Sequence, residues 1–183
     1  MVSVRFPAGR PYALPGWFVY VSRHGQPRGI EGLWRLYANV RIQHAASALG
    51  RLSCWLEARG ARFQIKLLDG SLIGSRPDAL VVFTSAVYVD AAVRCAARMA
   101  AESWLADATP GFALRVATGV AIAPELASAQ LAGRSYGQAC ARAAAEATFH
   151  AWQQRIYSDE DRSTLIAEHL ERGIAIQPVR EAE

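Results

Sequence analysis

Lysine is nearly absent from this sequence. Lysine and arginine together number 20, and Lys66 is the single lysine among them. Arginine stays charged at any ordinary pH, whereas the pKa of a lysine can be lowered until the neutral amine acts as a base. Lys66 is therefore either a residue that arginine cannot replace or an ordinary surface residue in a chain whose codon usage favours arginine.

Other features are also missing or scarce. The sequence has no run of about eighteen apolar residues, so no membrane-spanning helix is expected. Residues 1–16 contain several prolines and no long apolar stretch, and they do not resemble a signal peptide. The three cysteines are odd in number and lack metal-ligand spacing, which favours free thiols in a reducing cytoplasm and no metal site.

Signatures of common catalytic and nucleotide-binding sites are lacking as well. The sequence contains no G-x-S-x-G, no HExxH, no P-loop and no G-x-G-x-x-G. No cofactor is therefore expected. The net charge of +4 comes from dispersed arginines, which permits an anionic ligand but does not indicate nucleic acid.

Two segments, residues 33–42 and 62–69, alternate between apolar and polar side chains, as half-buried strands do. Their apolar faces predict packing on a core. Their polar faces carry Arg35, Tyr37 and Asn39 on the first segment, and Gln64 and Lys66 on the second. A merely solvated face is the alternative, but the first segment carries no acidic residue.

The remaining pattern predicts one α+β domain over residues 17–175, with a flexible lead-in over residues 1–16 and a tail over residues 176–183. We expect a mixed, mainly antiparallel sheet with helices packed on it. Further strands are predicted over residues 17–23, 79–84 and 112–118, helices over 43–59, 86–107, 135–155 and 158–172, and irregular structure over 119–131.

If the two alternating strands share a sheet, their polar faces bring a potential base close to a guanidinium and hydrogen-bond donors. Arg115 and Arg134 could join this cluster from a later strand and loop. Clustered arginines favour phosphate, which a guanidinium binds through two parallel hydrogen bonds. The cluster suits the removal of a carbon-bound proton next to a carbonyl while phosphate leaves from the neighbouring carbon.

A lysine must be neutral to remove that proton. Lowering its pKa from about 10.4 to about 7.5 requires roughly 4 kcal/mol of differential interaction. One arginine charge at about 4–6 Å supplies roughly 3–4 kcal/mol at an effective dielectric constant of about 20. One or two arginine neighbours are therefore sufficient without deep burial. His24 lies where a strand meets a turn, and it is either a general acid or a plain turn residue.

Four segments together resemble the HopA-type effector-like family. They are Leu36 to Val40, Gly60 to Leu68, Arg76 to Val82, and Arg134 to Gly137 with Arg142 in the following helix. The resemblance runs from about residue 19 to about residue 151. The family includes a plant-pathogen type III secretion effector and proteins encoded in thioamitide and class V lanthipeptide gene clusters.

In those clusters a kinase-like phosphotransferase phosphorylates Ser or Thr of a ribosomal precursor peptide. The HopA-type protein is taken to be the lyase that eliminates the phosphate, leaving dehydroalanine or dehydrobutyrine. The resemblance implies that Lys66 is the base and that Tyr37 or His24 protonates the leaving group. The residues expected to bind phosphate or substrate are Arg35, Asn39, Gln64, Arg115, Arg134, Tyr136 and Arg142.

Two functions from different classes are therefore expected. One is a cytoplasmic phosphoserine/phosphothreonine lyase that acts on a phosphorylated precursor peptide together with the phosphotransferase. The other is a non-catalytic binding subunit that presents the peptide to that partner. An oligomer or a hetero-complex suits both, because a short chain can require a partner to complete a peptide groove. A structural homologue with an unrelated role is a third interpretation.

Overall fold

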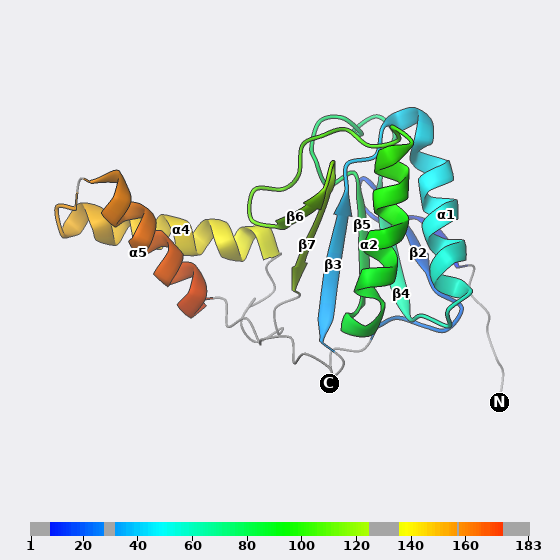
Figure 1. Ribbon diagram of the computed structural model, residues 1–183, viewed down its shortest axis with the longest axis horizontal. Helices are drawn as coiled ribbons and strands as arrows, with labels where there is room; N and C mark the ends of the chain where they lie inside the picture. Colours follow the sequence, from blue (N-terminus) through cyan, green and yellow to red (C-terminus); the bar gives the residue numbers. More distant parts are fainter. Residues whose placement is uncertain (1–7, 28–31, 125–135, 157, 174–183) are drawn as a thin grey trace. The chain divides into compact units, whose positions relative to one another are not determined.

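The computed structural model describes residues 8–27, 32–124, 136–156 and 158–173. Contacts between Cα atoms divide the chain into two compact units, Met1–Pro124 and Glu125–Glu183. The first unit contains a sheet covered by two long helices, and the second contains a pair of helices (Figure 1).

Seven strands form the sheet in the described part of the first unit. Every described pair of neighbouring strands runs antiparallel, in the order β1-β2-β4-β5-β3-β7-β6. The α+β class and the mainly antiparallel sheet predicted from the sequence are therefore confirmed. The strands are β1 (Gly9–Leu14), β2 (Trp17–Val21), β3 (Leu33–Ala38), β4 (Phe63–Leu68), β5 (Leu80–Ser85), β6 (Leu114–Ala117) and β7 (Val120–Pro124).

Strand β5 lies inside the sheet because it is apolar on both faces. Leu80 and Val82 belong to the core beneath the helices, and Val81 and Phe83 alternate with them on the opposite face. Its backbone pairs with β4 on one side and β3 on the other. An unbroken apolar run of this kind is typical of an interior strand.

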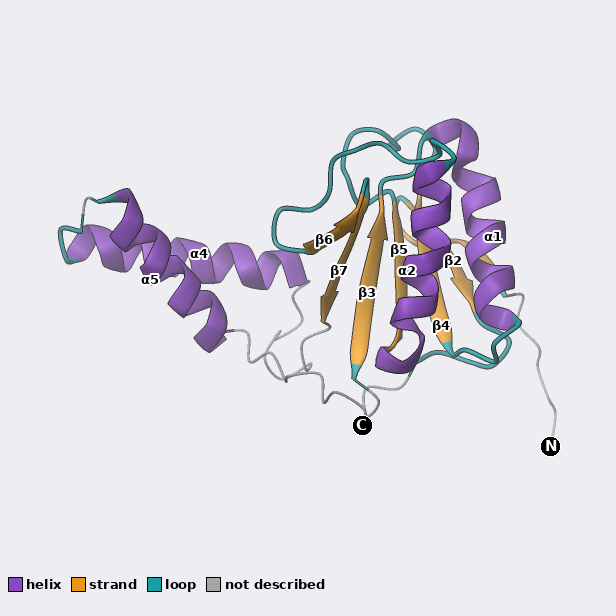
Figure 2. Cartoon of the chain, viewed as in Figure 1, coloured by secondary structure: helices purple, strands orange, loops and turns teal. Residues whose placement is uncertain are grey.

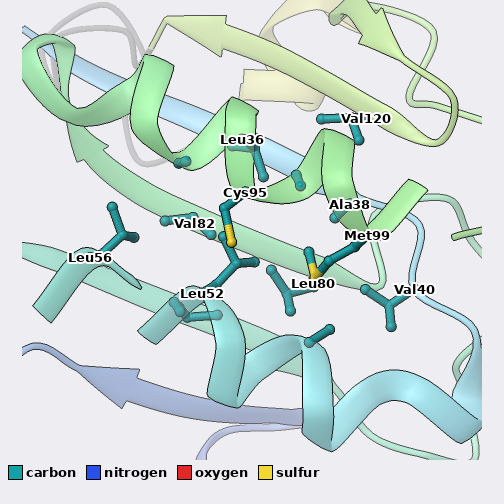
Figure 3. Close-up of a cluster of buried hydrophobic side chains, with 14 of the residues drawn as sticks. Leu36, Ala38, Val40, Leu52, Leu56, Leu80, Val82, Cys95, Met99 and Val120 are labelled. Carbon is teal, nitrogen blue, oxygen red and sulfur yellow. The ribbon is translucent and has the colours of Figure 1, made fainter. Parts of the chain in front are cut away.

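Two helices, α1 (Ala45–Glu57) and α2 (Ala86–Ala101), cover one face of the sheet, and a short 3-10 helix, η2 (Ile42–His44), leads into α1 (Figure 2). Alanine, leucine and other apolar residues recur at three- and four-residue spacing on the inward side of each helix. Figure 3 shows the resulting cluster between helices and strands. It includes Leu36, Leu52, Leu56, Leu80, Val82 and Met99, each fully buried.

Burial on this scale supplies the main driving force for the fold. Each fully buried leucine stabilises the folded state by roughly 1.5–3 kcal/mol relative to an exposed one. The three cysteines are free, with Cys54 exposed and the other two buried. Burial raises the pKa of the Cys95 thiol, so this residue behaves as a small apolar side chain rather than as a nucleophile.

Two strands occupy segments where the sequence predicts none. Residues 9–14, in the predicted lead-in, form β1 at an edge of the sheet, and residues 120–124, in the predicted irregular stretch, form β7. Pro11 and Pro124 made both segments poor strand candidates. Both prolines are tolerated because β1 is an edge strand and Pro124 is the last residue of β7.

In the second unit, α4 (Tyr136–Gln153) packs against α5 (Asp159–Gly173). The Asp161 backbone N–H donates to Ser158 Oγ at 3.2 Å, so Ser158 caps α5. Acidic residues fill the first turn of α5, where the helix dipole favours negative charge. The predicted tail over residues 176–183 lies outside the described residues. None of the helices in the described ranges has the length and apolar character needed to cross a bilayer.

The turn between β6 and β7 requires glycine at position 119. Gly119 has a φ of +65°, and a Cβ atom there would lie 2.1 Å from the Ala106 carbonyl oxygen. We expect Gly119→Ala to lower the free energy of unfolding by at least about 1–2 kcal/mol, because alanine is strained in this left-handed backbone conformation. Urea denaturation measures the change.

The matched control is Gly50→Ala within α1, where nothing lies within 4 Å of the added methyl group. This substitution should raise the free energy of unfolding by roughly 0.5–1 kcal/mol. Equal effects of the two substitutions would contradict the assigned turn geometry.

Candidate functional site

The face of the sheet turned away from α1 and α2, here termed the second face, carries the polar residues that the sequence singles out. Strand register places Lys66 beside Val81, and Val81 beside Tyr37. The neighbouring row contains Gln64, Phe83 and Arg35. The prediction that the polar faces of β3 and β4 share one sheet surface is therefore confirmed, with β5 between them.

Phe83 contacts two cations of this surface. The Lys66 Nζ atom lies 4.8 Å from the centroid of the Phe83 ring, and the Arg35 Cζ atom lies 5.2 Å from the same centroid. Both cationic side chains are half-buried. The ring face attracts each cation, typically by about 0.5–1 kcal/mol at exposed sites and by up to about 2 kcal/mol when water is excluded.

Phe83 and Arg35 have opposite effects on the charge of the Lys66 amine. The aromatic ring favours a charged ammonium group, and the nearby guanidinium repels one. A dianionic phosphate placed between them would be attracted by both cations, and Arg35 can bind it through two hydrogen bonds. The arrangement is thus suited to holding a phosphorylated side chain beside the one lysine of the chain.

Tyr37 lies in the row that contains Lys66. It is only 7% exposed, and its Cα atom lies roughly 10 Å from that of Lys66, two strand spacings away. Gln64 on the neighbouring row accepts a hydrogen bond from Gln26 Nε2 at 3.2 Å. This bond ties the segment after β2 to the second face.

Asn39 has a structural role that the sequence analysis does not foresee. Its side-chain Nδ2 donates to the Ala108 carbonyl oxygen at 3.0 Å, and its own carbonyl oxygen accepts from the Ala106 N–H at 2.8 Å. With 7% exposure, the amide is held by the loop that follows α2. The expected contact of Asn39 with substrate is therefore replaced by a contact with the fold.

Arg115 lies on β6, at the far edge of the sheet from Lys66. The two residues share the second face, but four strand spacings, or roughly 19 Å, separate their Cα atoms. The Arg115 guanidinium forms an ion pair with Asp107 at 2.5 Å. The structure therefore does not place Arg115 in the cluster around Phe83.

His24 belongs to a different cluster, on the side of the sheet that carries α1. Its Nε2 atom lies 3.6 Å from Glu57 Oε2, and it accepts a hydrogen bond from Arg23 Nε at 3.2 Å. Glu57 also accepts a hydrogen bond from the Tyr20 hydroxyl at 3.2 Å. The predicted role of His24 as general acid thus finds no support in its placement.

Three predicted site residues fall in the second unit or outside the described ranges. Arg134 and the side chain of Tyr136 lie outside the described residues. Arg142 forms an ion pair with Glu146 at 2.5 Å along α4. Within the described ranges, no group of three or more His, Cys, Asp or Glu side chains is arranged to hold a metal ion.

Phe83 is the site residue that sequence reasoning missed. The apolar run from Ala79 to Thr84 predicts an interior strand covered on both faces, not a binding residue. Its neighbours could have been found only from the strand order, which brings β5 between β4 and β3. No local pattern in the sequence specifies that order.

The fold has known counterparts. An α+β unit built on an antiparallel sheet, with helices on one face, defines the structural class. The model of the HopA1 effector protein family matches residues 8–178 of the chain. The protein therefore belongs to the HopA1 effector protein family.

Solved structures support the same fold. The chain is similar to the effector protein from Pseudomonas syringae pv. tomato strain DC3000, with a TM-score of 0.66, 14% identity, and coverage of 86% of this chain and 58% of that one. It is also similar to the effector protein from Pseudomonas syringae pv. syringae strain 61, with a TM-score of 0.60, 13% identity, and coverage of 85% and 58%. The chain thus spans 58% of the length of both effector structures. A search of curated protein sequences gave no match.

Asn39 forms a buried hydrogen bond and Gln64 an exposed one, and the free energy of unfolding can test this difference. We expect Asn39→Ala to lower the free energy of unfolding by about 1–3 kcal/mol, because the Ala108 carbonyl group loses its donor in a buried setting. Gln64→Ala should change it by less than about 0.5 kcal/mol, because its hydrogen bond is exposed. Urea denaturation of both variants measures the difference, and similar values would contradict the structural role of Asn39.

Proposed function

We propose that this protein is a phosphoserine/phosphothreonine lyase. Its substrate would be a phosphorylated ribosomal precursor peptide, and its product would contain dehydroalanine or dehydrobutyrine, as in lanthipeptide or thioamitide biosynthesis. The observation that carries the proposal is the pairing of Lys66 and Arg35 over one Phe83 ring on the second face.

The proposed reaction is a β-elimination. The neutral Lys66 amine removes the proton from the α-carbon of the phosphorylated residue, and the C–H electron pair becomes the new Cα–Cβ π bond. The Cβ–O bond breaks at the same time, and phosphate leaves with its electron pair. Arg35 holds the departing phosphate. Tyr37 is the candidate donor of a proton to the leaving oxygen.

The partial burial of the two cations supports the proposal. Lys66 and Arg35 are half-buried, which limits screening by water. A substrate phosphate would draw the guanidinium toward itself, because a charge-assisted contact with phosphate is stronger than a contact with an aromatic ring. A kinase-like phosphotransferase is the proposed partner that supplies the phosphorylated peptide.

One observation favours a second function. Contact with Phe83 stabilises the charged form of Lys66. A site that only binds phosphate requires this charged form, whereas proton removal requires the neutral amine. In this alternative, the protein is a non-catalytic subunit that binds the phosphopeptide and presents it to the phosphotransferase.

Substitution of Lys66 distinguishes the two functions. We expect Lys66→Arg to retain binding of a synthetic phosphothreonine peptide, because the charge remains, and to lose elimination by about 100- to 10,000-fold, because the guanidinium cannot act as a base. Lys66→Met should lose elimination and also bind more weakly. Mass spectrometry detects the loss of phosphoric acid, with and without an added phosphotransferase.

Arg76→Met is the control, because Arg76 is an exposed residue paired with Asp78. It should leave elimination unchanged. Undiminished dehydroamino acid formation by Lys66→Met would refute the lyase assignment. Binding of the phosphopeptide by the natural chain without any elimination would favour the presenting subunit.

A further inference from the structure

A second cationic surface lies on the helical layer, away from the second face. Arg51, Trp55 and Arg59 recur at four-residue spacing along α1 and just beyond its end. On α2, Arg94 and Arg98 show the same spacing. We term these five residues the α1–α2 seam, because contacts between the two stripes join the helices.

Two guanidinium groups share one indole ring within the seam. The Arg59 Cζ atom lies 3.9 Å from the centroid of the Trp55 ring, and the Arg98 Cζ atom lies 5.2 Å from it. Arg59 Nη1 also donates to the Trp55 carbonyl oxygen at 2.8 Å. Each contact is favourable by itself, but together they hold two like charges close to each other.

One carboxylate near the seam, that of Glu102, is already paired. Glu102 pairs with Arg51 at 2.7 Å, and this hydrogen bond lowers the pKa of Glu102. Among the residues that the structure describes, Arg59, Arg94 and Arg98 form no ion pair with an acidic side chain. All three are exposed. Three of the four arginines in the seam therefore present positive charge that no ion pair compensates in the described part of the chain.

We infer that the α1–α2 seam binds an acidic peptide segment, whose carboxylates pair with Arg98, Arg59 and Arg94. Contact with the Trp55 ring restrains the guanidiniums of Arg98 and Arg59, so less side-chain entropy is lost when a carboxylate binds. Arg94 and Arg98 lie one turn apart on α2, and Arg59 shares the Trp55 ring with Arg98. Charges spread over two helices in this way suit an extended or helical segment better than a small ion. This inference does not depend on the proposed lyase function.

The aromatic residues of this layer argue against nucleic acid as the ligand. Trp55 already carries two guanidiniums, and Trp104 carries Arg51 at 4.0 Å and stacks on His44 at 5.2 Å. Neither indole is left as a platform for a base. Glu102 adds a negative charge at one end of the seam, which a uniformly anionic polymer would have to approach.

The probe for this inference is a fluorescein-labelled peptide with several glutamates, compared with the same peptide carrying glutamines. Fluorescence anisotropy should show binding of the glutamate peptide alone, with an affinity that falls as salt is added. Arg98→Gln should weaken binding about tenfold, because one charge-assisted contact is lost. Arg94→Glu should weaken it further, since it reverses a charge without touching Trp55.

The matched control is Arg76→Gln. Arg76 also lies over an indole, with its Cζ atom 5.7 Å from the Trp17 ring, but it is paired with Asp78. This variant should bind the glutamate peptide as the natural chain does. Thermal unfolding checks that Arg98→Gln remains folded, and Arg94→Glu provides the test if it does not.

Three results would overturn the inference. They are equal binding of the two peptides, unchanged affinity in both Arg98→Gln and Arg94→Glu, and binding of single-stranded DNA or phosphatidylserine vesicles without binding of the glutamate peptide. Loss of phosphopeptide elimination in Lys66 variants, with glutamate-peptide binding intact, would show that the seam and the lyase site act separately.

Discussion

The shared contact of Lys66 and Arg35 with the Phe83 ring is the interaction on which the candidate site depends. It exists because β5 lies between β4 and β3 and because the register sets Phe83 beside both Gln64 and Arg35. A shift of one residue in either pairing would turn one cation toward the core. The register is fixed from the other side of the sheet, where Leu80 and Val82 are completely buried beneath the helices. Core packing on one face therefore determines the chemistry available on the other.

The polar residues of the first unit differ in role. On the second face, the half-buried Lys66 and Arg35 share an aromatic ring and can meet a ligand. Elsewhere, polar groups stabilise the fold. Asn39 donates a hydrogen bond to the loop that follows α2. Glu57 contacts Tyr20, Arg23 and His24 beside α1. Asn39 is buried and the Glu57 side chain is only 13% exposed, so the hydrogen bonds of these two residues commit them to the fold.

Membership of the HopA1 effector protein family at 13–14% identity to two solved effectors has a physical explanation. A sheet of this type needs apolar and polar side chains that alternate along its outer strands. It also needs an apolar run in its central strand and small residues where helices approach. These requirements fix the pattern of side chains and leave most identities free. The pattern can therefore persist while catalytic or binding residues change, which is why function has to be argued from the site.

The sequence by itself determined the α+β class, the alternating strands β3 and β4, the interior strand β5 and the helices, because each depends on a local periodicity. It also singled out Lys66 by composition and predicted that Arg35 and Tyr37 share its surface. Only the tertiary structure decided that Pro11 and Pro124 lie in strands, that Asn39 serves the fold, and that Arg115 and His24 lie apart from Lys66. It also placed Phe83 between the two cations. These outcomes follow from strand order and register, which arise from contacts between residues distant in the chain and leave no local pattern to read.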